Sequence, residues 1–440
     1  MNLSLYGHDG AWLAIDLGIT FGGDRYPEHA VMMADPGFLA ARRERLAGLV
    51  LTHGHEDHIG AVPYLWRRLR CPIYATPFTA ALVRHKLASV GIADAPLIEI
   101  RPGSRLQIGP FAVESIRMTH SIPESQALLI GTPAGAVLHS GDWKFDDRPV
   151  VGAHYDAARL RALRRAPLLA LVCDSTNAIV PGRTGSEGEL FAALRELAEQ
   201  SSGRVIVTCF ASNIARLVTL ARVASALGRR FGVLGQAMQR MIAVAQVCGY
   251  WPDDLPELVD ARHLGFLPCA EVLIACTGSQ GETGSALARL VADRHRDLML
   301  DPGDMLVFSS KMIPGNERSV ERLQRQARQL GLAVITDADA MVHVSGHPAA
   351  DDLRRLYEEV QPPSVIPVHG TPRHLAANAA IARDCHVPRV EIVRNGDLCR
   401  LDPAGPQVIG QVETGRLTLM DGGRLEAVAP GLLREMREAG

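Results

Sequence analysis

Short apolar runs alternate with amphipathic segments along most of this chain, and several of the runs end in polar residues. The run GLVL at 48–51 predicts a buried strand, and a histidine-rich loop follows it at once. After that loop, apolar residues recur at the spacing of one helix face: Ile59, Val62, Leu65, Trp66 and Leu69. Further strands that end in polar side chains are predicted at 111–118, 135–142 and 168–175. The pattern predicts an α/β protein whose reactive groups gather at strand ends.

The pattern changes to regular strand–helix units from about residue 183 to about residue 338. This alternation predicts an inserted α/β domain with a parallel sheet, 183–338. The pattern of strands that end in histidines returns in AMVHVSGH and SVIPVHG. The core is therefore predicted in two parts, 1–182 and 339–404. The last segment, 405–440, is Gly-rich and weakly patterned. We expect it to be a linker, or a remnant that leads towards a missing C-terminal domain.

Composition narrows the class of protein without choosing a function. The chain has 440 residues, of which 47% are hydrophobic and 21% charged, as in ordinary globular proteins. It contains no run of about 18 apolar residues and no recognisable secretory signal, so no membrane association is expected. The eight cysteines are scattered without a CxxC pair, which favours reduced thiols in a cytoplasm. Because the net charge is −2, a polyanionic partner would need a local basic channel.

The most informative motif is THGHEDHIG, which contains His53, His55, Asp57 and His58. Two histidines two positions apart after a strand can chelate one ion, and the next two residues can face a second ion. Imidazole and carboxylate donors suit zinc first, with manganese as the alternative. Alone, Asp57 would more often cap a helix, but three neighbouring histidines favour metal binding.

The HxHxDH pattern after an apolar strand resembles the signature of the metallo-β-lactamase superfamily, which has an αββα sandwich fold. Later pieces resemble its remaining motifs in order, with His120 in MTHSIPES, Asp142 in SGDWKFD and His369 in PVHG. The resemblance implies two ions that share Asp142. One ion is also held by His53, His55 and His120, and the other also by Asp57, His58 and His369.

Two such ions would lower the pKa of a bridging water to about 7. Metal-binding side chains also need outer partners that fix their orientation. Glu56 and Asp146 are our candidates for that role.

The long stretch between Asp142 and His369 resembles the β-CASP nucleases, whose inserted α/β domain closes over the metal cleft. Asp174 in DSTNA, His347 in HVSGH and His369 resemble their three motifs. The resemblance implies that Asp174 and His347 act near the leaving O3′, one of them as proton donor. We also count Asp57 as catalytic, and a turn cap is the alternative for Asp174. RNA-processing members carry histidine at the third motif, whereas DNA-repair members carry valine, so His369 favours RNA.

Within the RNA branch, several phrases resemble bacterial ribonuclease J: DSTNA, FASN, CTGSQGE, SSKMIPGNE and HVSGH. The resemblance implies 5′→3′ exoribonuclease and endoribonuclease activity in RNA maturation and decay, with 5′-monophosphorylated single strands preferred. It also implies a homodimer and a possible RNA-degradation complex. The terminal phosphate would contact the following residues: Ser212, Asn213, His343, Val344, Ser345, Gly346 and His347. Phe21 resembles a base-stacking aromatic, with core packing as the alternative.

Some features depart from the ribonuclease J pattern. Family members usually begin with a Gly-rich strand and end in a small C-terminal domain, and we expect both to be lacking here. Ala215 and Thr371 also stand where other residues are common.

Two rival hypotheses stay open. The first is a DNA nuclease or another hydrolase of the same fold, and the second is an RNA-binding paralogue without activity, which the complete ligand set disfavours.

Overall fold

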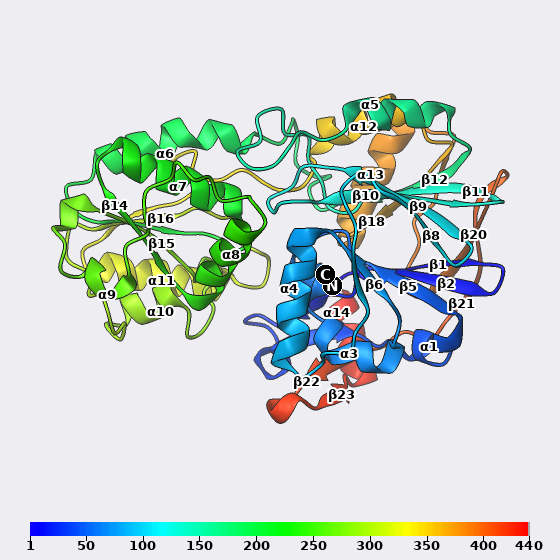
Figure 1. Ribbon diagram of the computed structural model, residues 1–440, viewed down its shortest axis with the longest axis horizontal. Coiled ribbons are helices and arrows are strands. Elements are labelled where there is room, and N and C mark those ends of the chain that lie inside the picture. Colours follow the sequence, from blue (N-terminus) through cyan, green and yellow to red (C-terminus); the bar gives the residue numbers. More distant parts are fainter. Residues whose placement is uncertain (439–440) are drawn as a thin grey trace.

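The computed structural model describes residues 1–438, except for the side chains of residues 434, 437 and 438, and it has two lobes (Figure 1). In the larger lobe, two sheets lie face to face. The first sheet has the order β1 (Ser4–His8), β2 (Ala11–Ile15), β5 (Leu46–Val50), β6 (Ile73–Ala75) and β7 (Leu97–Glu99). The second has the order β19 (Arg389–Val390), β18 (Ser364–Val368), β12 (Leu168–Asp174), β11 (Gly135–His139), β10 (Gln126–Thr132), β9 (Phe111–Arg117) and β8 (Arg105–Ile108).

Helices cover the outer faces of both sheets. The first sheet carries α3 (Val62–Leu69) and α4 (Pro77–Ser89), and the second carries α5 (Ala157–Ala162), α12 (Ala350–Val360) and α13 (Pro372–Asp384). Apolar side chains of the two inner faces meet in the middle, among them Leu13, Val50, Phe111 and Leu128. The arrangement confirms the predicted sandwich of two sheets between helices.

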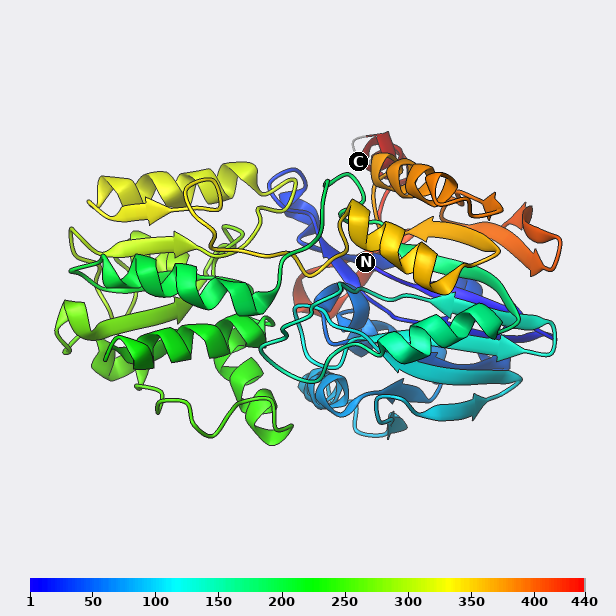
Figure 2. The same ribbon diagram turned by 90° about the horizontal axis from the view of Figure 1, so that it is seen from above.

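The smaller lobe is built on a parallel sheet, as predicted. Its strands have the order β14 (Arg230–Leu234), β15 (Val272–Cys276), β13 (Val205–Thr208), β16 (Met305–Phe308) and β17 (Ala333–Ile335). The surrounding helices are α6 (Leu190–Glu199), α7 (Ile214–Ala226), α8 (Gln236–Val247), α9 (Ala261–Leu264), α10 (Ala286–Val291) and α11 (Glu317–Gln329). The runs VIVT, VLIAC and MLVF are buried throughout, which is the pattern of strands covered on both faces. Figure 2 shows the connections between the lobes passing side by side.

The C-terminal segment differs from the expected linker. β21 (Gly405–Gln411) forms a hairpin with β20 (Asp397–Asp402). Further along, β22 (Arg416–Leu419) joins a sheet with β3 (Ile19–Phe21), β4 (Val31–Ala34) and β23 (Leu425–Ala427), before α14 (Pro430–Glu438). Leu417 lies opposite Met33 and is buried, so the segment up to residue 438 packs on the core. Residues 439–440 lie outside the described residues.

The predicted apolar helix face at 59–69 is confirmed, because all five of its residues are buried. The helix is in two parts, however, since α2 (Glu56–Ile59) ends before α3 begins. No helix among residues 1–438 is both long and apolar enough to cross a bilayer.

Packing of the C-terminal segment on the core can be measured. Replacing Leu417, which is 5% exposed, by alanine should lower the free energy of unfolding by about 2–4 kcal/mol, because it leaves a cavity in the core. Chemical denaturation of both forms measures the difference. The matched control is Ile409→Ala at a 52% exposed position in the same segment, with an expected loss of about 0.5 kcal/mol or less. Equal losses in the two variants would contradict the packing.

Candidate metal centre

The candidate ligands come from strand ends at one edge of the two sheets. β5 leads into His53 and His55, β9 into His120, β11 into Asp142, and β18 into His369. β9 and β11 run the same way because each is antiparallel to β10, and β11, β12 and β18 are parallel to one another. Their carboxyl ends therefore share an edge, as the sequence predicted.

Three of the histidines form one cluster. The Nε2 atoms of His53 and His120 each lie 3.1 Å from Nδ1 of His55. These three nitrogens lie within 4.8 Å of one another, close enough to bind a single ion.

A second cluster contains Asp57, His58, Asp142 and His369. Oδ2 of Asp142 lies 3.1 Å from Nε2 of His58, and its Oδ1 lies 2.9 Å from Nδ1 of His369. The other ring nitrogen of His369 lies 3.3 Å from Oδ2 of Asp57. Asp142 is also 3.8 Å from Nε2 of His53, so its carboxylate stands between the two clusters.

Hydrogen bonds outside the clusters decide which ring nitrogens can bind a metal. Nδ1 of His120 donates to the carbonyl of Gly346 over 2.5 Å, and Nδ1 of His58 donates to Asp16 over 2.7 Å. The Thr52 hydroxyl donates to Asp16 over 2.9 Å, so it can accept from Nδ1 of His53 at 3.0 Å. In its neutral form, each of these rings therefore keeps a lone pair on Nε2, directed into the clusters. This donor set fits divalent metal ions.

The charges of the site also fit cations. Burial lowers the pKa of His55 to about 4 and the pKa of His53 and His120 well below the usual value, so these rings are neutral. Burial alone would raise the pKa of Asp142, but the neighbouring His369 and His58 hold it well below its usual value. Burial lowers the pKa of His58 and His369, but Asp142 and the carboxylates beside it raise it well above its usual value. The second cluster therefore attracts positive charge, which bound cations would supply in place of the two protons.

Sequence reasoning missed two residues of this centre. Asp16 directly follows β2 and orients both His58 and Thr52. The Asn2 amide donates to Asp57 Oδ2 over 3.2 Å and lies 3.0 Å from Nε2 of His58. The signal for Asp16 was its place after the apolar run AWLAI, whereas Asn2 stands outside any motif.

The outer partners suggested by the sequence, Glu56 and Asp146, serve other groups. Glu56 accepts from Lys86 at 2.5 and 2.8 Å, because the first turn of α2 directs it towards α4. Asp146 pairs with Lys144 at 3.1 Å and accepts from the backbone of Glu187. The expectation was therefore wrong for both.

Asp174 and His347 lie beside the second cluster, as a pair. Nδ1 of His347 is 2.8 Å from Oδ2 of Asp174, while the other oxygen of Asp174 accepts from the Thr176 amide and hydroxyl. Asp174 thus has both the turn-cap contact and the histidine partner that the sequence offered as alternatives. Burial lowers the pKa of His347, but Asp174 and Asp142 raise it above its usual value, which favours a ring able to give a proton.

The residues expected to bind substrate fall into different environments. Gly346 packs against the His120 ring, and a Cβ there would lie 2.7 Å from Cε1 of that ring, so only glycine fits. Ser345 accepts from Asn177 at 2.7 Å. His343 is half-buried, its buried Nδ1 has no hydrogen-bond partner among the described residues, and burial lowers its pKa to about 3. Val344 is buried beside Gly185.

The expected substrate residues outside the HVSGH segment lie before α7 in the inserted lobe and at the end of β3. Asn213 caps α7 by accepting from Arg216, and it donates to Glu187 at 3.2 Å. Ser212, the residue before it, is half-buried. Phe21 is 61% exposed at the end of β3, which removes core packing as the alternative for this side chain.

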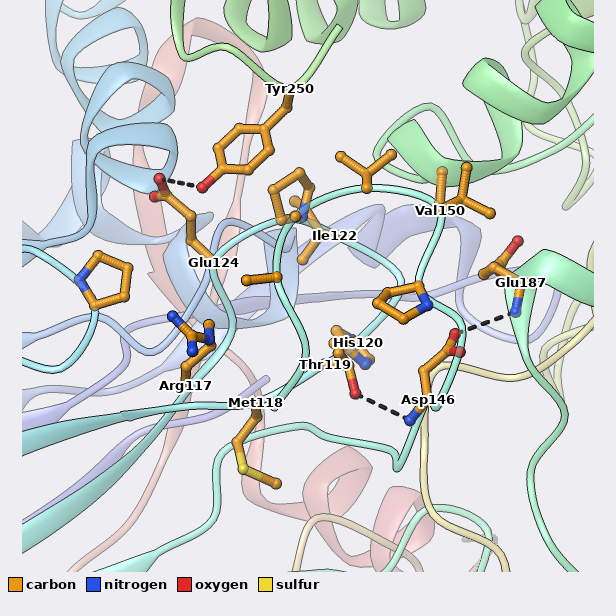
Figure 3. A pocket seen from close by; sticks show the side chains of 17 residues that line it. Arg117, Met118, Thr119, His120, Ile122, Glu124, Asp146, Val150, Glu187 and Tyr250 are labelled. Carbon is orange, nitrogen blue, oxygen red and sulfur yellow. Dashed lines mark hydrogen bonds between the residues drawn. The ribbon is translucent and has the colours of Figure 1, made fainter. Parts of the chain in front are cut away.

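A cavity of about 110 Å³ lies behind His120, between the core and the inserted lobe (Figure 3). On its wall, Tyr250 of the inserted lobe donates to Glu124 over 2.9 Å. Glu124 also accepts from the Phe78 amide at the start of α4. The loop that follows His120 is therefore held between α4 and the other lobe.

The role of Asp16 leads to a prediction. Asp16→Asn should lower the affinity for zinc about 10- to 100-fold, because the amide no longer accepts equally from His58 and Thr52. Competition with a chromophoric chelator measures that affinity. Asp9→Asn, in the exposed β1–β2 turn, is the control and should bind as the unmodified chain does. Unchanged affinity in Asp16→Asn would contradict the role.

Three family models match the chain. Residues 2–173 match the model described as Metallo-beta-lactamase superfamily, and residues 202–326 match Ribonuclease J, beta-CASP domain. Residues 331–388 match Zn-dependent metallo-hydrolase RNA specificity domain. Among solved structures, a protein of unknown function from Enterococcus faecalis has a TM-score of 0.59 at 14% identity, with 89% of this chain and 94% of that chain covered. That likeness shows the fold alone.

Curated relatives are similar over almost the whole chain. Ribonuclease J of Sinorhizobium meliloti is 39% identical, with 100% of this chain and 79% of the relative covered. Ribonuclease J of Mycolicibacterium smegmatis is 38% identical, with 94% and 75% covered. Ribonuclease J 1 of Streptococcus pyogenes is 35% identical, with 97% and 76% covered. With the β-CASP model matched between two parts of a metal-binding core, the chain belongs to the ribonuclease J family.

Proposed function

We propose that this chain is a metal-dependent ribonuclease that degrades RNA from the 5′ end and also cuts within the strand. The observation that carries the proposal is the convergence of seven donor side chains, with Asp142 between two clusters, beside the Asp174–His347 pair. Membership of the ribonuclease J family and the match to an RNA specificity domain support RNA as the substrate.

Two divalent ions would be held by the two clusters, with Asp142 common to both. Zinc suits a mixed set of imidazoles and carboxylates, and manganese is the alternative. When bound, the ions supply a nucleophilic water at neutral pH and positive charge for the phosphate. Asp57 has two roles in this proposal, as a ligand and as a catalytic carboxylate.

His347 would give the proton to the leaving O3′. Asp174 occupies its Nδ1 at 2.8 Å, which leaves Nε2 as the nitrogen that can face a substrate. Thr176 fixes the other oxygen of Asp174, so the pair is held in one orientation. A general acid at this position offsets the poor leaving ability of an alkoxide.

The 5′-phosphate of a single strand would lie near the HVSGH segment, with Ser345 and Gly346 as its first contacts. His343, Val344, Ser212 and Asn213 complete the proposed phosphate site, and Phe21, with its exposed ring, would stack on a base. A cytoplasmic location, a homodimer, a possible RNA-degradation complex and the domain limits given above stay predictions.

The ligand role of His369 can be tested by its removal. His369→Ala should lower RNA hydrolysis about 1000-fold, since loss of one ion removes several kcal/mol of transition-state stabilisation. The measurement is the rate on labelled RNA together with the metal content. His386→Ala is the matched control, because His386 is exposed and has the same left-handed backbone, with φ of 58° against 57° at His369. Full activity in His369→Ala would refute the ligand role.

The proposed binding of the 5′-phosphate leads to a second prediction, about the rate of RNA degradation. RNA with a 5′-monophosphate should be degraded about tenfold faster than the same RNA with a 5′-hydroxyl, because a phosphate adds charge-assisted hydrogen bonds. A time course with labelled RNA should show mononucleotides from the first time point. Equal rates, with only long internal fragments released, would remove the exonuclease from the proposal.

A further inference from the structure

A buried arginine lies where both connections between the lobes reach the inserted sheet. Arg216, on the first turn of α7, is 0% exposed. Its guanidinium donates to the carboxylate of Glu187 at 3.1 and 3.2 Å. It also donates to the carbonyl of Ser309 at 2.8 Å and to the carbonyl of Val342 at 3.1 Å. One side chain therefore binds the connection into the lobe, the end of β16, and the connection that returns to the core.

The connection into the lobe is fixed to the loop that carries Asp142. Lys144 is fully buried, pairs with Asp146 at 3.1 Å and donates to the carbonyl of Gly185 at 3.2 Å. Asp146 in turn accepts from the backbone of Glu187 at 3.1 Å, a contact drawn in Figure 3. A continuous chain of contacts between buried polar groups thus connects the loop that carries Asp142 to Glu187, and Glu187 to Arg216.

The returning connection carries the proposed proton donor. The Val342 carbonyl accepts from Arg216 and also from the Ser309 hydroxyl at 2.6 Å. Farther along the same segment, the Gly346 carbonyl orients His120, and His347 pairs with Asp174. A shift of this segment would displace His347 directly, because the segment carries it. His120 lies on the loop after β9, so the same shift would affect only its hydrogen bond to Gly346.

A buried ion pair is by itself poor evidence for a special role, because its desolvation offsets much of its attraction. The placement of the donors is more informative. The planar guanidinium reaches acceptors on three separate segments in fixed directions, which a lysine ammonium cannot do. The contacts are suited to fixing geometry at the junction of the lobes.

We propose that Arg216 is a positioning residue for RNA cleavage, which holds segment 342–347 so that His347 meets the leaving oxygen. The inference rests on the proposed function and deepens it. Arg216 does not touch the metal clusters, and it acts through Val342 and the residues that follow.

The test compares two substrates whose leaving groups differ in their need for a proton. Cleavage of RNA releases an alkoxide, which needs a proton from the general acid. Cleavage of bis(p-nitrophenyl) phosphate releases p-nitrophenolate, which is a stable anion and needs no proton. Arg216→Lys should lower kcat on RNA about 10- to 100-fold, since a small misplacement of a catalytic group has effects of this size. Its rate on the ester should stay within about twofold of the unmodified chain, with metal content unchanged.

Arg229→Lys is the matched control. Arg229 is also a buried arginine of the inserted lobe. Among the described residues, its guanidinium donates only to backbone carbonyls of that lobe, at Ala198, Ser201, Gly203 and Val272. It should leave both rates unchanged. Ser309→Ala removes the other donor to Val342 with little change in volume, and should repeat the RNA-specific loss at about threefold. It keeps the test decisive if Arg216→Lys fails to fold.

A double variant of Arg216→Lys and His347→Asn distinguishes an effect on the position of His347 from a general loss of stability. If Arg216 acts through His347, Arg216→Lys should cause no further loss on RNA in the His347→Asn background. Three results would overturn the inference while the proposed function stands. The first is a full further loss on RNA in the His347→Asn background, and the second is an equal loss on both substrates. The third is an unchanged RNA rate in both Arg216→Lys and Ser309→Ala. An unmodified chain that hydrolyses the ester but not RNA would overturn the proposed function, and the inference with it.

Discussion

The buried carboxylate of Asp142 is the constraint on which the rest of the centre depends. Its oxygens lie between 2.9 and 3.9 Å from ring nitrogens of five histidines, at positions 53, 58, 120, 347 and 369. An ionised carboxylate removed from water requires compensating positive charge, and these five rings, crowded together, cannot all carry it. Metal cations would supply that charge between the carboxylate and the lone pairs of the imidazoles, so the site is suited to bind them.

The structure brings the seven candidate ligands together, and their signals in the sequence are local. The histidines of the HxHxDH motif lie within one loop, and the later ligands each follow an apolar strand. The partners that orient these ligands were harder to predict. Asp16 reaches His58 only because β2 lies beside β5, and the partner of His120 is a backbone carbonyl, which has no side-chain signal. Glu56 was wrongly chosen because nearness in sequence to His55 does not give the direction of its side chain.

The sequence predicted the main sheets of the fold but not the packing of its C-terminal segment. Long runs such as LLALVCD and VLIAC, buried on both faces, gave the sandwich strands and the parallel sheet. For 405–440 a linker or a remnant was predicted, and the packing of 405–438 on the core was not. Its strands are only partly buried, and β22 and β23 have only four and three residues. Its partner β4 is nearly four hundred residues away in sequence, so the pairing of Leu417 with Met33 is invisible to local patterns.

Metal binding by the two clusters is the central claim, and anomalous diffraction from zinc-loaded crystals tests it most directly. The account predicts two zinc peaks about 3.5–4 Å apart, one at each cluster and both next to Asp142. Each peak should lie about 2.0–2.2 Å from its imidazole and carboxylate donors. Zinc peaks elsewhere in the chain, with the seven side chains bound to none, would contradict it.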